Sequence, residues 1–70
     1  MSDDEAPTTF AAAMDWIGSR SGLYAMKVEG DHVLISVRVD GLTASEAATS
    51  MEESDLEAAL VRAIRRIAGP

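Results

Sequence analysis

The chain has 70 residues, of which twelve are acidic and six are basic; its formal net charge is −6 and it contains no cysteine. A chain of this length forms one domain at most. Without cysteine it has neither disulfides nor a thiolate metal site to stabilise a small core. The negative charge disfavours binding to nucleic acids and to anionic membrane surfaces. Because the N-terminal segment "MSDDEAPTTF" is acidic where a secretory signal is positively charged, we expect a cytoplasmic protein.

The first structured segment is predicted to be an amphipathic helix. Thr8 and Thr9 follow a proline, and either is a suitable N-cap residue. Apolar residues then recur at the helical period and form one stripe, at Phe10, Met14 and Ile17. Gly22 is the expected stop of this helix. Trp16 lies on the flank of the stripe and not at its centre.

The next segment, "LYAMKVEGDHVLISVRV", predicts a β-hairpin around a two-residue turn at Gly30 and Asp31. In this register Glu29 faces His32, and every second pair brings two apolar side chains to the same face of the sheet. These apolar pairs are Val28 with Val33, Met26 with Ile35, and Tyr24 with Val37. A slip of one residue would move every side chain to the opposite face, so the pattern favours this register.

The opposite face of the hairpin is mixed, but it carries one contiguous apolar patch. The patch consists of Leu23, Ala25 and Leu34. A small sheet with one bare face is a weak structure by itself, and contiguous exposed apolar surface is typical of interaction sites. These points favour an interface on this face or at the edge of the sheet. We therefore expect a homo-oligomer, such as a dimer, with these three residues at its interface.

The segment "DGLTASEAATS", residues 40–50, allows more than one structure. A third strand starting at Leu42 would place Glu46 on the core face of the sheet, and alanine, serine and glutamate are poor strand residues. A short helix is the alternative, because "TASE" matches a capping box with Thr43 as the cap. A strand, a helix and a loop all stay open for this segment.

The C-terminal segment is predicted to be a second amphipathic helix. Its apolar stripe comprises Leu56, Ala59, Leu60, Ala63, Ile64 and Ile67. The motif "SDLE" predicts a capping box in which Ser54 is the N-cap and Glu57 reaches back to it, and "SMEE" is a second possible start one turn earlier. Gly69 and the proline after it end the helix. Three arginines lie near the negative end of the helix dipole, at Arg62, Arg65 and Arg66.

This order of elements predicts an α+β fold. A helix, an antiparallel β-hairpin with a possible third strand, and a second helix follow one another, and both helices are expected to cover one face of the small sheet. Residues 8–70 form this single domain. Residues 1–7 are acidic and end in proline, so they are expected to be a disordered tail.

No group of residues with the pattern of a catalytic or cofactor site stands out. There is no cysteine, no serine in a nucleophile-elbow motif and no glycine-rich phosphate loop. Glu29, Asp31 and His32 lie together at the hairpin tip and could hold a divalent ion, but turn formation alone explains glycine and aspartate there. We therefore predict a non-enzymatic protein with no cofactor, no metal site and no catalytic residue.

Two resemblances bear on function. The order of elements, with "VRVDG" before the last helix, resembles the double-stranded-RNA-binding domain. That family places RNA-binding lysines at the start of its last helix, where this chain reads "EESDLEA", so RNA binding is not carried over. The helix "SDLEAALVRAIRRI" resembles the helix that follows the strands of HicB-type antitoxins, which implies a toxin-binding protein.

The distribution of acidic residues indicates binding to a protein with a basic surface. Carboxylates compete with phosphates for lysine and arginine. We therefore interpret the chain as an inhibitor or decoy that occupies a nucleic-acid-binding site, of the phage or mobile-element type and comparable to anti-CRISPR proteins. The alternatives are a homo-oligomeric structural or accessory subunit and a HicB-like antitoxin. The predicted partner-binding residues are Glu52, Glu53, Asp55, Glu57 and, as an apolar anchor, Trp16.

Overall fold

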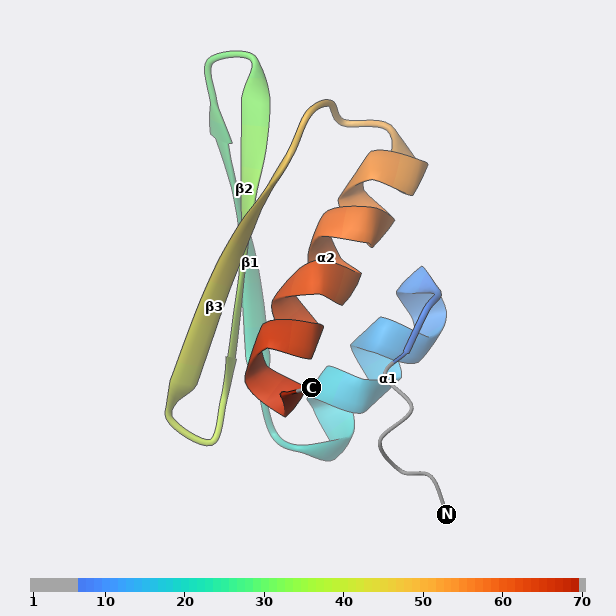
Figure 1. Cartoon of the computed structure of the whole chain (residues 1–70), viewed down its shortest axis with the longest axis vertical. Coiled ribbons are helices and arrows are strands. Elements are labelled where there is room, and N and C mark those ends of the chain that lie inside the picture. The colour runs from blue at the N-terminus through green and yellow to red at the C-terminus, as the bar shows by residue number, and fades with distance from the viewer. Residues whose placement is uncertain (1–6, 70) are drawn as a thin grey trace.

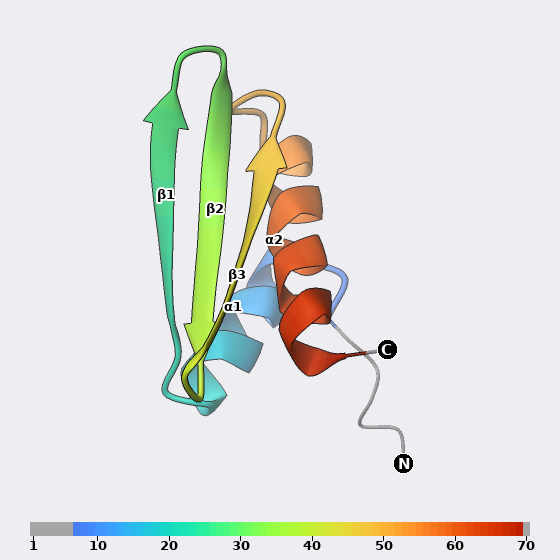
Figure 2. The same cartoon turned by 60° about the vertical axis from the view of Figure 1, so that its left-hand side comes forward.

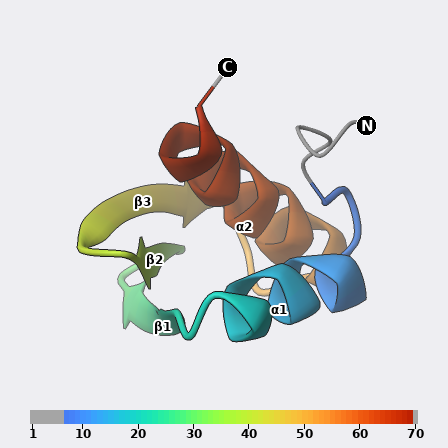
Figure 3. The same cartoon turned by 90° about the horizontal axis from the view of Figure 1, so that it is seen from below.

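The computed structural model describes residues 7–69, so the expected tail over residues 1–7 lies, apart from Pro7, outside the described residues. The elements in chain order are α1 (Phe10–Ser19), β1 (Leu23–Glu29), β2 (His32–Val39), β3 (Leu42–Ala48) and α2 (Glu53–Ala68). The strands form one antiparallel sheet in the order β1-β2-β3. Both helices lie on the same face of this sheet (Figures 1 and 3). The predicted α+β fold is therefore confirmed.

The hairpin of β1 and β2 has the predicted register, from Glu29 opposite His32 to Leu23 opposite Arg38. Gly30 takes a positive φ of 61° at the turn, a conformation that glycine adopts without steric cost. The alternation of apolar residues and the turn chemistry point to the same pairing, which is why the sequence alone was sufficient to predict it.

Residues 42–48 form the third strand, which decides between the alternatives left open for this segment. The turn before it has positive φ at both Asp40 (54°) and Gly41 (79°), the combination that a two-residue hairpin turn of type I′ requires. β3 pairs with β2 along its whole length, with Ala44 opposite Val37 and Glu46 opposite Ile35. Glu46 thus lies on the helix-facing side of the sheet, as expected for a strand starting at Leu42.

The core lies between the helices and the strands β2 and β3. The residues of β2 that face the helices are all buried, and α2 supplies the largest share of the remaining core. The buried side chains of β2 and α2 are Val33, Ile35, Val37, Val39, Leu56, Ala59, Leu60, Ala63 and Ile64. By contrast, β1 supplies no buried side chain, although its residues Tyr24, Met26 and Val28 face the same side. The helix layer therefore covers the central strand and one edge strand, and leaves β1 open.

The first helix begins as predicted and ends slightly earlier than predicted. The Oγ1 atom of Thr9 accepts a hydrogen bond from the N–H of Ala12 (3.1 Å) and caps α1. The helix ends at Ser19, and the left-handed residue after it is Ser21 (φ 55°) and not Gly22. A Cβ atom on Gly22 would lie 2.6 Å from Cγ2 of Val39. Gly22 is therefore required by close packing against β2.

The predicted capping box of the second helix is wrong. The helix begins at Glu53 with Glu52 as the N-cap residue, whose side chain makes no capping hydrogen bond. Ser54 lies inside the helix, and Glu57 instead accepts a hydrogen bond from the N–H of Phe10 (2.7 Å). A long-range contact with α1 has thus replaced the local one. The helix ends at Ala68 with Gly69 at a φ of 88°, as predicted.

Candidate protein-interaction surfaces

Acidic side chains surround a shallow hollow at the start of α2, the upper end of that helix in Figure 1. The hollow has a volume of about 540 Å³ and is lined by Glu52, Glu53, Ser54 and Glu57. Glu52 and Glu53 are exposed. Three of the four predicted acidic partner-binding residues thus come together around one open depression, with no basic side chain in its lining.

Two of the four predicted acidic residues have roles within the fold. Oδ2 of Asp55 accepts a hydrogen bond from Oγ of Ser50 (2.6 Å) and a longer one from Oγ1 of Thr49 (3.3 Å), which secures the loop before α2. Glu57 binds the first N–H of α1 at Phe10, where the positive end of that helix dipole favours a carboxylate. The positions of Asp55 and Glu57 are therefore fixed by the fold, in contrast to those of Glu52 and Glu53.

Trp16 is not part of the acidic hollow. It is half-buried, packs against the core and does not line the hollow. The guanidinium carbon of Arg20 lies 4.1 Å from its ring centroid, in the geometry of a cation–π interaction. Nη1 of Arg20 also donates to the backbone oxygen of Trp16 (3.2 Å). The structure therefore separates the predicted apolar anchor from the acidic residues.

Several basic side chains are paired with carboxylates of the same chain. Nε of Arg62 lies 3.1 Å from Oε1 of Glu46, and Nη1 of Arg66 lies 3.2 Å from Oε2 of the same residue. Nζ of Lys27 lies 3.1 Å from Oε2 of Glu29. Positive charge is thus engaged along β3 and at the hairpin tip, while the start of α2 presents carboxylates only.

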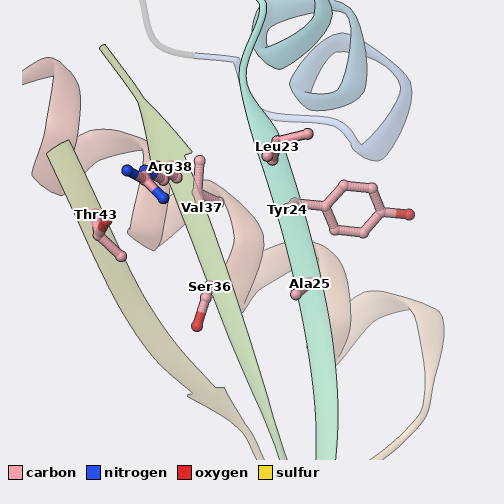
Figure 4. A pocket seen from close by; sticks show the side chains of 7 residues that line it. All are labelled: Leu23, Tyr24, Ala25, Ser36, Val37, Arg38 and Thr43. Carbon is pink, nitrogen blue, oxygen red and sulfur yellow. The ribbon is translucent and has the colours of Figure 1, made fainter. Parts of the chain in front are cut away.

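The three residues of the predicted oligomer interface on the outer face of the sheet do not form one surface. Leu23, Tyr24 and Ala25 of β1 line a hollow of about 410 Å³, together with Val37 and polar residues of β2 and β3 (Figure 4). The polar residues of this lining are Ser36, Arg38 and Thr43. Leu34 is half-buried and does not line the hollow. The outer face is therefore mixed in character.

A second exposed apolar surface lies on β1. The exposed fractions are 39% for Tyr24, 43% for Met26 and 65% for Val28. Figure 4 shows the Tyr24 ring pointing outward from β1, away from Ser36 and Arg38. The sequence places these three residues on the core face, and their alternation contains no signal that the helices leave this strand uncovered.

The hairpin tip brings the single histidine close to two carboxylates. Nδ1 of His32 lies 3.5 Å from Oδ1 of Asp31, and Nε2 lies 3.8 Å from Oε1 of Glu29. Asp31 and His32 are exposed, and Glu29 is half-buried. Among residues 7–69, no group of three or more histidine, cysteine or acidic side chains has the placement of a metal site. Within the same residues, neither helix combines the length and the apolarity needed to cross a membrane.

Comparisons with protein-family models, with curated proteins and with solved structures gave no match to this chain. The resemblances to the double-stranded-RNA-binding domain and to HicB-type antitoxins are therefore limited to "VRVDG" with the order of elements and to "SDLEAALVRAIRRI". Function has to be inferred from the surfaces of the molecule itself, which are the acidic hollow, the outer sheet face and β1.

Proposed function

We propose that this chain is a small, acidic, non-enzymatic module that binds a protein partner at a basic surface. The observation that carries this proposal is the open hollow at the start of α2, where Glu52, Glu53 and Glu57 converge without a basic neighbour in the lining. The formal charge of −6 adds a long-range attraction for basic surfaces. A partner that binds nucleic acid presents such a surface.

The arrangement of the acidic residues suits competition with phosphate groups. Asp55 and Glu57 are held by hydrogen bonds, so they add fixed negative charge beside the hollow. Glu52 and Glu53 project into solvent and can reach a lysine or arginine of the partner. Glu52 makes no capping hydrogen bond, so capping does not account for its presence. This supports an inhibitor or decoy that occupies a nucleic-acid-binding site.

The test is affinity capture from the native host with two variants of equal charge. Glu52→Gln combined with Glu53→Gln removes two carboxylates from the hollow. Asp15→Asn combined with Asp31→Asn removes two exposed carboxylates elsewhere and is the matched control. Each exposed ion pair contributes about 0.2–1 kcal/mol, so the first variant, which removes two carboxylates, should lose roughly two- to thirtyfold in affinity.

The proposal predicts two separate results for this experiment. Capture of the partner by the wild type should weaken as salt is raised, because exposed charges are screened. The control variant should bind within about twofold of the wild type. Binding that survives high salt unchanged, or equal losses in the two variants, would contradict a role for the hollow.

A further inference from the structure

The two edges of the sheet differ in how they are protected. On the β3 edge, Nη2 of Arg62 donates to the backbone oxygen of Ala47 (2.9 Å). The carboxylate of Glu46 points inward between Arg62 and Arg66 and has a side-chain exposure of 19%. An inward-pointing charge and a covered backbone group are devices that prevent another strand from adding to an edge. These contacts protect the β3 edge at Glu46 and Ala47.

Among residues 7–69, β1 has neither an inward-pointing charge nor a side chain bonded to its outer backbone groups, and Lys27 of this strand is paired with Glu29. Glu29 and His32 flank a two-residue turn, so they form the hydrogen-bonded pair that closes the hairpin. Hydrogen-bonded and non-hydrogen-bonded pairs alternate along an antiparallel ladder. The N–H and C=O groups of Val28, Met26 and Tyr24 consequently point away from β2. The same alternation, counted from the turn at Gly41, leaves the Ala47 carbonyl on the outer side of β3, where Arg62 binds it.

The residues with outward-pointing backbone groups are also the residues with exposed apolar side chains. Tyr24, Met26 and Val28 all face the helix side of the sheet, and all three are exposed. Figure 2 shows β1 as the outer strand of the sheet, with α2 beside β3 at the other edge. A strand added to β1 would satisfy the backbone groups and cover the apolar side chains at the same time.

We propose that a second copy of this chain pairs with β1 in the antiparallel direction, with Met26 of one copy facing Met26 of the other. Met26 is the middle residue of β1, so this register pairs the strand along its whole length. Tyr24 of each copy then faces Val28 of the other. In each of these pairs two apolar side chains lie side by side, and the outward-pointing backbone groups of the two residues can bond to each other.

The charges of β1 favour a second copy over a basic partner. The strand contains one basic and one acidic residue, Lys27 and Glu29, which pair with each other at 3.1 Å. The edge is therefore neutral within a chain of charge −6, which suits association of two identical molecules. In the Met26-centred register Lys27 faces Ala25 of the second copy, whereas a register centred on Lys27 would place two lysines directly opposite each other, which is destabilising.

The resulting dimer has one continuous sheet of six strands, because each copy contributes three. Its two-fold axis is perpendicular to the sheet, so the helices of both copies lie on the same face and flank the seam between the β1 strands. This interface differs from the outer-face patch of Leu23, Ala25 and Leu34. It is also independent of the acidic hollow, because neither Glu52 nor Glu53 takes part in it.

The first test is the molar mass in solution, measured by light scattering after size exclusion. The wild type should have about twice the 7.4 kDa of one chain. Met26→Glu places two carboxylates opposite each other at the seam and should run as a monomer with an unchanged circular dichroism spectrum. Leu42→Glu is the matched control, because Leu42 is an apolar residue of β3 with 56% exposure, and this variant should stay dimeric.

The second test concerns the register. Residues that form a hydrogen-bonded pair have Cα atoms about 5.5 Å apart, and their Cβ atoms are farther apart than an unstrained disulfide requires. Met26→Cys in this cysteine-free chain should therefore give a covalent dimer with a short bifunctional thiol reagent, whereas Leu42→Cys should not. A wild type that is monomeric at its highest attainable concentration would overturn the proposal. So would a dimer that Leu34→Glu dissociates and Met26→Glu leaves intact, because its interface would be the outer face.

Discussion

Glu46 is the residue whose substitution best tests the account of β3. It stands on the helix-facing side of an edge strand, where an apolar residue is the usual choice, and it is held there by Arg62 and Arg66. Glu46→Gln keeps the size of the side chain and removes its charge. If the two arginines are what makes an acidic residue acceptable at this position, the substitution should destabilise the fold.

The expected magnitude follows from the exposure of the partners. Both arginines are exposed, so solvent screens the attraction and each pair contributes about 0.2–1 kcal/mol. The two pairs together should contribute about 1 kcal/mol. The free energy of unfolding of a 70-residue domain is about 4–10 kcal/mol, so the loss is a sizeable part of the total. For a domain of this size, 1 kcal/mol corresponds to a decrease in Tm of about 4–8 °C.

The measurement is urea and thermal unfolding followed by circular dichroism. Glu29→Gln is the matched control, because Glu29 is also paired, with Lys27, but at the exposed hairpin tip. Its effect should lie within about 0.5 kcal/mol of zero. If Glu46→Gln is as stable as the wild type, or if both substitutions have the same effect, the arginines do not stabilise Glu46 and the explanation given for β3 is wrong.

Two further substitutions test other contacts of the fold. Gly22→Ala should destabilise by about 1–3 kcal/mol, because its Cβ would lie 2.6 Å from Cγ2 of Val39; Gly18→Ala, where no atom lies within 4 Å, should stabilise by about 0.5–1 kcal/mol. Glu57→Ala should cost about 1–2 kcal/mol, because it removes the acceptor of the Phe10 N–H. Urea unfolding measures the effect of all three substitutions. A neutral result for Gly22→Ala would show that Val39 can move aside for the added methyl group, and a neutral result for Glu57→Ala would show that the hydrogen bond to Phe10 is not stabilising.

The hairpin could be predicted from the sequence because all of its determinants are local. The turn residue Gly30 and the alternation on either side of it specify the same register. The N-cap at Thr9 was predictable for the same reason, since its bond to Ala12 spans three residues.

The third strand and the start of α2 could not be predicted, because distant residues determine them. Glu46 is tolerated in a strand through Arg62 and Arg66, which lie 16 and 20 residues further along the chain. Instead of the predicted local capping bond, Glu57 accepts a hydrogen bond from the N–H of Phe10, 47 residues away. Tertiary contacts of this kind override local propensity. They cannot be inferred from the motifs "TASE" and "SDLE" themselves.

The interaction surfaces were predictable in part. The acidic hollow gathers Glu52, Glu53 and Glu57, which sequence proximity and the helical period already place together. The separation of Trp16 from this hollow depends on how α1 packs against α2, which periodicity does not specify. The exposure of β1 depends on which strands the helices cover. The alternating sequence pattern of a strand is the same whether or not helices pack on it.

The difference between the sheet edges limits what kind of assembly the chain can form. A chain of 70 residues without cysteine has a small core and commonly needs a further source of stability. In the single chain, β1 is hydrogen-bonded on one side only and its residues Tyr24, Met26 and Val28 are exposed. Pairing through β1 would supply the missing burial and turn an edge into the middle of a sheet. Further growth would be disfavoured, because the outer strands of the pair are both β3, where Arg62 binds the Ala47 carbonyl and Glu46 places a charge on the inner side. The proposed pairing through β1 therefore predicts a dimer rather than an extended fibre.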